Sequence, residues 1–72
     1  MVKATYIYSF LELSGKPKRF IESKSECKIQ GYGVSTDTVT LSILYENTNA
    51  FNIINKTLLD KFNLTPIHIN FI

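Results

Sequence analysis

The hydrophobic pattern of the chain changes its period between residues 38–45 and residues 49–62. In the first stretch every second position is apolar, at Val39, Leu41, Ile43 and Tyr45. In the second stretch the apolar positions recur at helical spacing, at Phe51, Ile54, Leu58 and Phe62. Alternation is typical of a strand with one buried face, and the longer period is typical of a helix that covers such a face. The two stretches predict an α+β fold, in which a small antiparallel sheet packs against one main helix at about 49–62.

Polar residues on either side of this helix fit its two ends. Residues 46–49 (Glu-Asn-Thr-Asn) offer several N-cap side chains. Asn63 can take the left-handed conformation that ends a helix, Leu64 can fold back over the last turn, and Pro66 prevents its continuation. The helix is therefore the best-defined element that the sequence predicts.

The last residues, 67–72, alternate again and predict a final strand. We expect this strand to turn its apolar side chains toward the core and its polar side chains outward. The apolar set is Ile67, Ile69 and Phe71, and the polar set is His68 and Asn70.

The N-terminal part of the chain predicts a hairpin. Residues 4–13 are rich in β-branched and aromatic residues and indicate a strand. Residues 14–17 (Ser-Gly-Lys-Pro) have turn chemistry, and a second strand is expected at about 18–23.

Two interpretations stay open for residues 23–33. Ser23 and Glu26 have the spacing of a capping box, and Gly31 would suit a C-terminal stop, which favours a short helix at about 24–30. The alternative is a strand from Cys27 to Val34, bent at its glycines.

The first strand is apolar on both of its sides, and the sequence leaves open which side is buried. One side carries Tyr6, Tyr8 and Phe10, and the other carries Ile7, Leu11 and Leu13. One helix covers only one face of a sheet, so the second side either lacks a cover or is buried by a second helix at about 24–30 or by a curved sheet with this strand at its centre. If the aromatic side is the exposed one, it offers a contiguous surface for a partner or a second copy. The basic residues that follow in the predicted loop form its charged rim, namely Lys16, Lys18 and Arg19.

The length of 72 residues allows one domain, residues 1–72, and sets a narrow limit on its stability. Folding should bury roughly 7,400 Å². That burial supplies on the order of 107 kcal/mol, against about 108 kcal/mol for ordering the chain. No apolar run is long enough to span a membrane, and no signal-peptide pattern precedes the first strand. The single Cys27 excludes an internal disulfide, which favours a cytoplasmic setting.

Motifs for catalysis are absent from the sequence. Gly31 and Gly33 form only a fragment of a phosphate-binding loop. One Cys and one His, Cys27 and His68, are too few for a closed zinc site, and such a pair arises by chance in many small proteins. We therefore expect no enzyme activity, no catalytic residues, no cofactor and no metal.

These observations favour a small non-enzymatic protein-binding module whose partner is another protein or a second copy of the chain. Residues encoded by AT-rich codons (Phe, Tyr, Met, Ile, Asn and Lys) make up 32 of the 72 positions. Such coding is common in phages and mobile elements, which suggests an inhibitor or accessory protein that acts in a host cell. The alternative function is nucleic-acid binding, with the basic loop on phosphates and the strand aromatics stacked on bases. A net charge of only +2 and a single Arg argue against it.

Overall fold

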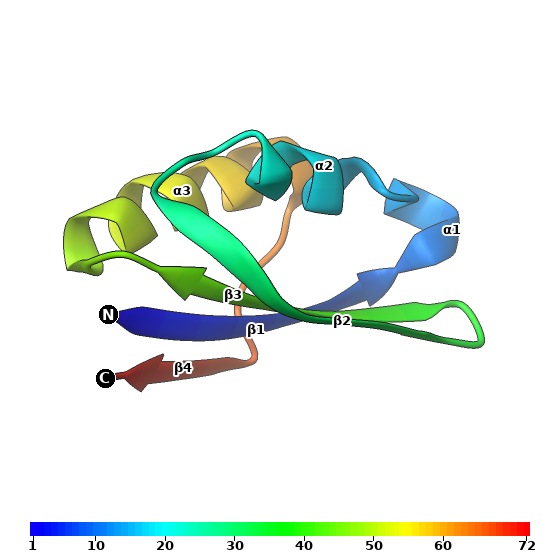
Figure 1. The fold of residues 1–72 in the computed structure, drawn as a ribbon. Helices are drawn as coiled ribbons and strands as arrows, with labels where there is room; N and C mark the ends of the chain where they lie inside the picture. Colours follow the sequence, from blue (N-terminus) through cyan, green and yellow to red (C-terminus); the bar gives the residue numbers. More distant parts are fainter.

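Four antiparallel strands form one sheet, and the helices lie on one of its faces (Figure 1). The computed structural model describes residues 1–72. The elements in chain order are β1 (Val2–Ser9), α1 (Phe10–Leu13), α2 (Lys16–Glu22), β2 (Cys27–Ser35), β3 (Thr38–Tyr45), α3 (Thr48–Phe62) and β4 (His68–Phe71). The strand order is β2-β3-β1-β4. The α+β fold expected from the sequence, with an antiparallel sheet against one main helix, is confirmed.

The main helix begins and ends at the residues that its sequence suggests. The side chain of Asn47 accepts a hydrogen bond of 2.8 Å from the amide of Ala50, which caps the first turn of α3. Asn63 ends the helix with a φ of 57°, and the Leu64 amide donates to the carbonyl oxygen of Leu58 at 3.3 Å. These caps fix where the chain leaves α3 toward β4.

The predicted N-terminal hairpin is wrong. Strand β1 ends at Ser9, and two short helices replace both the rest of that strand and the second one. Ser14 takes a φ of 53° between them. Pro17 then lies in the first turn of α2, where its missing N–H is tolerated, and buries its ring together with Ile21 one turn later. The helical spacing of these two buried residues outweighs the turn chemistry.

The predicted short helix at 24–30 is also wrong, and the alternative strand is present as β2. Ser23 closes α2 and does not open a new helix, because its hydroxyl donates to the carbonyl oxygen of Phe20 at 2.6 Å. Strand β2 forms a hairpin with β3, and its register shifts between Ile29 and Gly31. Thr36 turns the hairpin with a φ of 58°.

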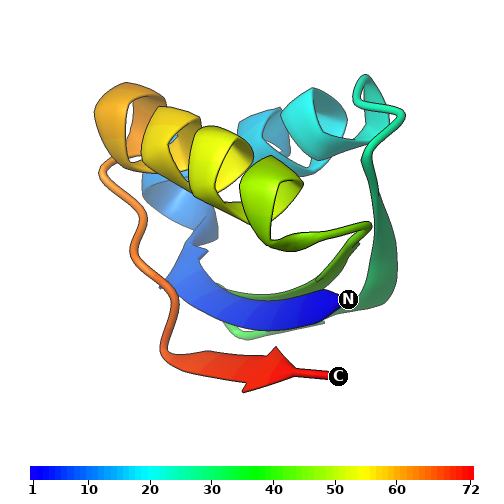
Figure 2. The same cartoon turned by 90° about the vertical axis from the view of Figure 1, so that its left-hand side faces the viewer.

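The core lies between the sheet and the helices, which form two layers in the view of Figure 2. On β1 the even-numbered residues face the helices and are buried, and the odd-numbered ones face the open side of the sheet. The largest fully buried side chains come from both layers and are Tyr6, Tyr45, Ile21, Leu41, Ile43 and Leu58.

The last strand is present, but its apolar side chains are not in the core. Ile69 pairs with Ala4 and Phe71 pairs with Val2, so both point toward the side of the sheet that carries the helices. However, β4 is the edge strand and lies farthest from the helix layer (Figures 1 and 2). No residue of β4 is buried. The expectation that Ile67, Ile69 and Phe71 fill the core is wrong for this reason.

Candidate functional site

Two of the predicted aromatic anchors lie inside the domain. Tyr6 and Tyr8 point from β1 toward the helices and are 0% and 6% exposed. The exposed aromatic row expected from the sequence is therefore wrong for these residues, and their rings are not available to a partner in this fold. Phe10 follows the strand as the first residue of α1 and is partly exposed, apart from the other two.

The predicted basic rim lies on α2 and not in a hairpin loop. Its members are Lys16, Lys18 and Arg19, of which the first and last are exposed. The Nζ atom of Lys18 is 3.0 Å from Oε2 of Glu22 and 5.2 Å from the ring centroid of Tyr32 on β2. Lys18 therefore meets an aromatic ring, but not the strand aromatics on which the nucleic-acid alternative depends.

Three side chains join β1, β3 and α3 through two hydrogen bonds, one buried and one partly buried. The Tyr6 hydroxyl donates to Oδ1 of Asn55 at 2.7 Å and lies 2.8 Å from the hydroxyl of Tyr45. Because the Tyr6 proton is directed at Asn55, the Tyr45 hydroxyl donates the second bond. Burial raises the pKa of Tyr6 to about 12 and also raises the pKa of Tyr45. Both phenols stay neutral and act as structural groups.

The Tyr8 hydroxyl is buried and has no hydrogen-bond partner. Burial raises the pKa of Tyr8 to about 12, and the neighbouring Tyr32 adds to this shift. A buried polar group without a partner is destabilising, so this hydroxyl lowers the stability of the fold.

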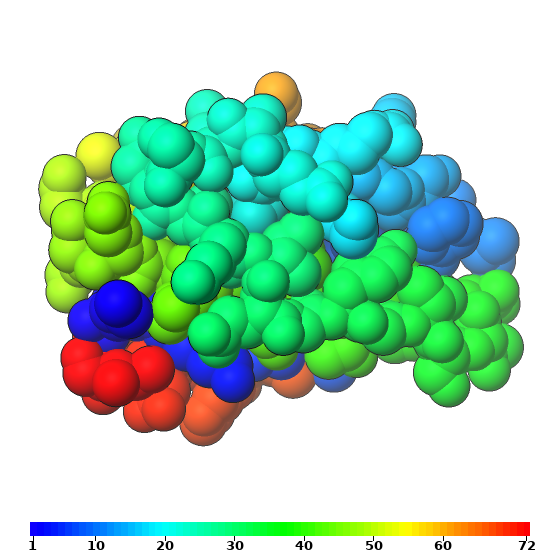
Figure 3. Space-filling model, in the orientation of Figure 1, coloured from blue at the N-terminus to red at the C-terminus, as the bar shows by residue number.

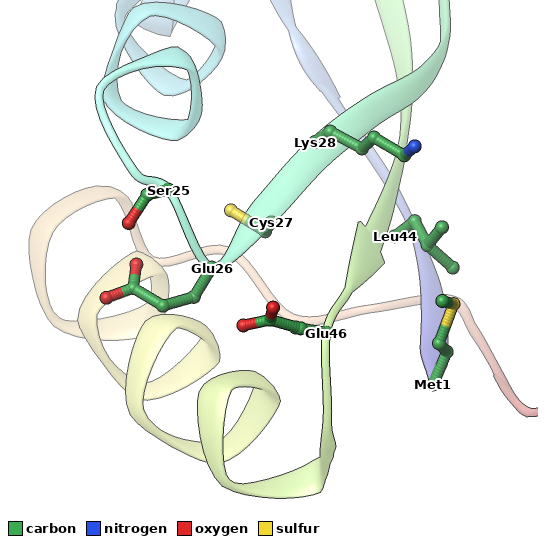
Figure 4. Close-up of a pocket in the computed structure, with 7 residues that line it drawn as sticks. All are labelled: Met1, Ser25, Glu26, Cys27, Lys28, Leu44 and Glu46. Carbon is green, nitrogen blue, oxygen red and sulfur yellow. The ribbon is translucent and has the colours of Figure 1, made fainter.

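A cavity of about 240 Å³ lies at the start of β2 (Figure 4). Its lining residues are Met1, Ser25, Glu26, Cys27, Lys28, Leu44 and Glu46. Burial raises the pKa of the Cys27 thiol, whose Sγ is 3.9 Å from the carbonyl oxygen of Ile21, so the reactive thiolate is disfavoured. The strand order places Cys27 and His68 on opposite edges of the sheet, which separates the only Cys from the only His. Nowhere do three or more His, Cys, Asp or Glu side chains gather in a way that could hold a metal ion.

The two edges of the sheet differ in how they are protected. Strand β2 carries a bulge and Lys28, and α2 packs against it. Bulges, lysines and covering helices are the usual devices that prevent an edge from pairing with another chain. Strand β4 has a regular register with β1, with no bulge, no proline and no charged side chain. Apart from its short length of four residues, the β4 edge therefore has none of these devices.

The hydrogen-bond ladder shows which backbone groups are free on β4. The Ile72 amide donates to the Met1 carbonyl oxygen at 2.8 Å, and the Met1 amino group donates to the Ile72 carbonyl oxygen at 3.0 Å. Hydrogen-bonded and non-hydrogen-bonded pairs alternate along an antiparallel ladder, and the register continues without a shift through Phe71 and Ile69. The N–H and C=O groups of Ile69 and Phe71 therefore point away from β1, to the free edge.

Exposed apolar side chains surround these free groups. The residues are Ile67, Ile69, Phe71 and Ile72, which are 61%, 39%, 65% and 73% exposed. We call these four side chains, together with the outward backbone groups of Ile69 and Phe71, the β4 edge surface. In the space-filling view the C-terminal end of the chain lies on the molecular surface beside the N-terminal part (Figure 3).

Besides its alternation, the last strand has a second sequence feature that bears on this surface, namely its lack of charged residues. No charged residue follows Lys61, although the predicted final strand needs one solvated face. Charged side chains usually keep an edge strand from pairing with another chain, whereas a central strand has no need of them. The lack of charges on β4 therefore points to contact with another chain only together with the strand order, which places β4 at the edge of the sheet.

Comparisons with protein-family models, with curated proteins and with solved structures found no significant match to this chain. None of its helices has the length and apolar character needed to cross a membrane.

Proposed function

We propose that this domain is a non-enzymatic protein-binding module that binds an extended segment of its partner along the β4 edge surface. The supporting observation is the coincidence of free backbone groups and apolar side chains on the same residues, Ile69 and Phe71. A strand added at this edge would gain main-chain hydrogen bonds from the backbone and contact area from the side chains. This is a different surface from the aromatic row expected on the first strand.

The chemistry of the surface defines the segment it would accept. On the helix side of β4, Ile69 and Phe71 present apolar area, and on the open side His68 and Asn70 present polar groups. A matching strand therefore alternates apolar and polar residues and needs no charges. A phage- or mobile-element-encoded inhibitor or accessory protein could occupy a strand of its target in this way.

A peptide titration followed by NMR tests the proposal. The probe is a short capped peptide of alternating isoleucine and threonine, and the control peptide is N-methylated at the amides that would face the protein. We expect the amides of Ile69 and Phe71 to shift and to become protected from hydrogen exchange with the first peptide only. The Phe71→Lys variant should lose this binding, because the lysine removes apolar contact area and leaves the fold intact at an exposed position.

Two results would contradict the proposal. One is equal binding of both peptides, because strand addition depends on the amides that the control lacks. The other is a set of shifts confined to residues away from β4, for example around Lys18 and Tyr32.

A further inference from the structure

We infer that the segment bound at the β4 edge surface is β4 of a second copy, in one defined antiparallel register. This inference rests on the proposed function and names the partner. A two-fold axis perpendicular to the sheet would join the two sheets edge to edge, in the order β2-β3-β1-β4-β4-β1-β3-β2. Both helix layers would then lie on the same side of a continuous sheet.

The free backbone groups select the register. Each copy offers the N–H and C=O groups of Ile69 and Phe71 at its edge. If Ile69 of one copy lies opposite Phe71 of the other, all four donors and all four acceptors of the two copies are paired. Asn70 then lies opposite Asn70 of the second copy, on the two-fold axis.

A register shifted by one pair is less suitable. It would place Ile69 opposite Ile69 of the second copy and Ile67 opposite Phe71. The Ile67 amide, however, already donates to the carbonyl oxygen of Thr5 at 2.8 Å within its own copy. The shifted register would therefore leave outward groups of Phe71 without their full complement of partners.

The side chains are self-complementary in the selected register. On the helix side, Ile69 of each copy meets Phe71 of the other, so apolar groups that are exposed in the single chain cover one another. On the open side, the two Asn70 amides face each other, and each can donate and accept. The absence of charges on β4 removes the like-charge repulsion that usually prevents a strand from pairing with itself.

The area fits a weak but specific dimer. In the selected register the second copy covers Ile69, Phe71 and Ile72, whereas Ile67 lies beyond the paired residues, so the interface buries less than about 1,000 Å² in total, the size of weak, transient interfaces. We therefore expect association at micromolar concentrations and not a permanent dimer.

Sedimentation equilibrium tests the association on the whole chain, from low micromolar to several hundred micromolar. The wild type should rise from the monomer mass of 8.2 kDa toward twice that value. Phe71→Lys should stay monomeric. The matched control is Ile53→Lys, at a residue of α3 that is 60% exposed, and it should associate as the wild type does.

Disulfide cross-linking tests the register, in a Cys27→Ser background that removes the natural thiol. The α-carbons of a non-hydrogen-bonded pair are about 4.5 Å apart, which a disulfide can span. Asn70→Cys should therefore form cross-linked dimers at least about tenfold faster than His68→Cys, whose counterpart lies roughly 13 Å away along the strands.

Together with the peptide titration, these measurements distinguish a failure of the inference from a failure of the proposed function. A chain that stays monomeric but binds the alternating peptide at β4 overturns the inference and leaves the proposed function standing. A dimer that survives Phe71→Lys, or that cross-links equally through Asn70→Cys and His68→Cys, overturns the inference as well. A monomer that also fails to bind the peptide overturns both.

Discussion

The hydrogen bonds among Tyr6, Tyr45 and Asn55 predict that losing the Tyr6 hydroxyl alone costs at least as much free energy of unfolding as losing both hydroxyls. Tyr6→Phe removes the hydroxyl that accepts from Tyr45 and donates to Asn55. The Tyr45 hydroxyl then has no partner in a side chain that is fully buried. A buried polar group without a partner costs about 1–3 kcal/mol of the free energy of unfolding.

The reciprocal variant should be milder. Tyr45→Phe leaves the Tyr6 hydroxyl with its bond to Asn55, so the loss is about 1 kcal/mol, that of one hydrogen bond. In the double variant neither hydroxyl of this pair remains, and partly exposed Asn55 can bond to water. The double variant should therefore be no less stable than Tyr6→Phe alone.

Urea unfolding of the wild type and the three variants measures these free energies. All four proteins are compared at one concentration, because self-association would shift the apparent stability. For a domain of this size, 1 kcal/mol corresponds to roughly 4–8 °C in Tm, so thermal unfolding gives a second readout. If the double variant loses the sum of the two single losses, the hydroxyls do not depend on each other and the network described here is wrong.

Three further changes test other parts of the structure. Tyr8→Phe should be neutral or stabilise the fold by up to about 1 kcal/mol, because it removes a buried hydroxyl without a partner, and a clear loss in urea unfolding would reveal a partner. Asn47→Ala should cost about 1 kcal/mol by removing the cap on the Ala50 amide, and Asn47→Asp should restore most of the loss. Below about pH 9 the free energy of unfolding should not change with the ionisation of the buried tyrosines, and above about pH 10 it should fall. Tyrosines of the unfolded chain lose their protons there, whereas Tyr6, Tyr8 and Tyr45 keep theirs in the folded state. The expected slope in urea unfolding is up to about 1.4 kcal/mol per pH unit for each tyrosine, and Tyr8→Phe should reduce it by about a third.

The elements that the sequence predicts well are those in which several local signals agree. Strand β3 alternates strictly over its whole length, and α3 has a helical period, an N-cap at Asn47 and a left-handed stop at Asn63. Each signal alone is ambiguous, but their agreement leaves one structure. The α+β fold follows from these two neighbouring elements.

The N-terminal half could not be predicted in the same way because its local signals conflict. Ser23 and Glu26 match a capping box, yet Ser23 lies at the end of helix α2. The sequence does not predict α2, because the residues before Pro17 have turn chemistry. Once α2 occupies residues up to Glu22, the glycine-containing segment behind it is free to pair with β3. The error at one helix thus produced the error at the next strand.

The candidate site could not be predicted from the alternation of apolar and polar residues alone. Alternation in β4 correctly predicts that Ile69 and Phe71 share a side with Val2 and Ala4. It does not say whether a helix lies above that side, which depends on strand order.

In this fold α2 packs against β2 and α3 against β3, so the helix layer lies toward one edge of the sheet and leaves β4 uncovered. The same apolar residues would be core in a central strand, and at this edge they are an interface. Because burial and binding place the same demand on these side chains, and an uncharged strand fits either role, the sequence alone does not distinguish the two. A lysine at position 71 is therefore the substitution that separates them, since it would unfold a core strand but should only prevent association at an edge.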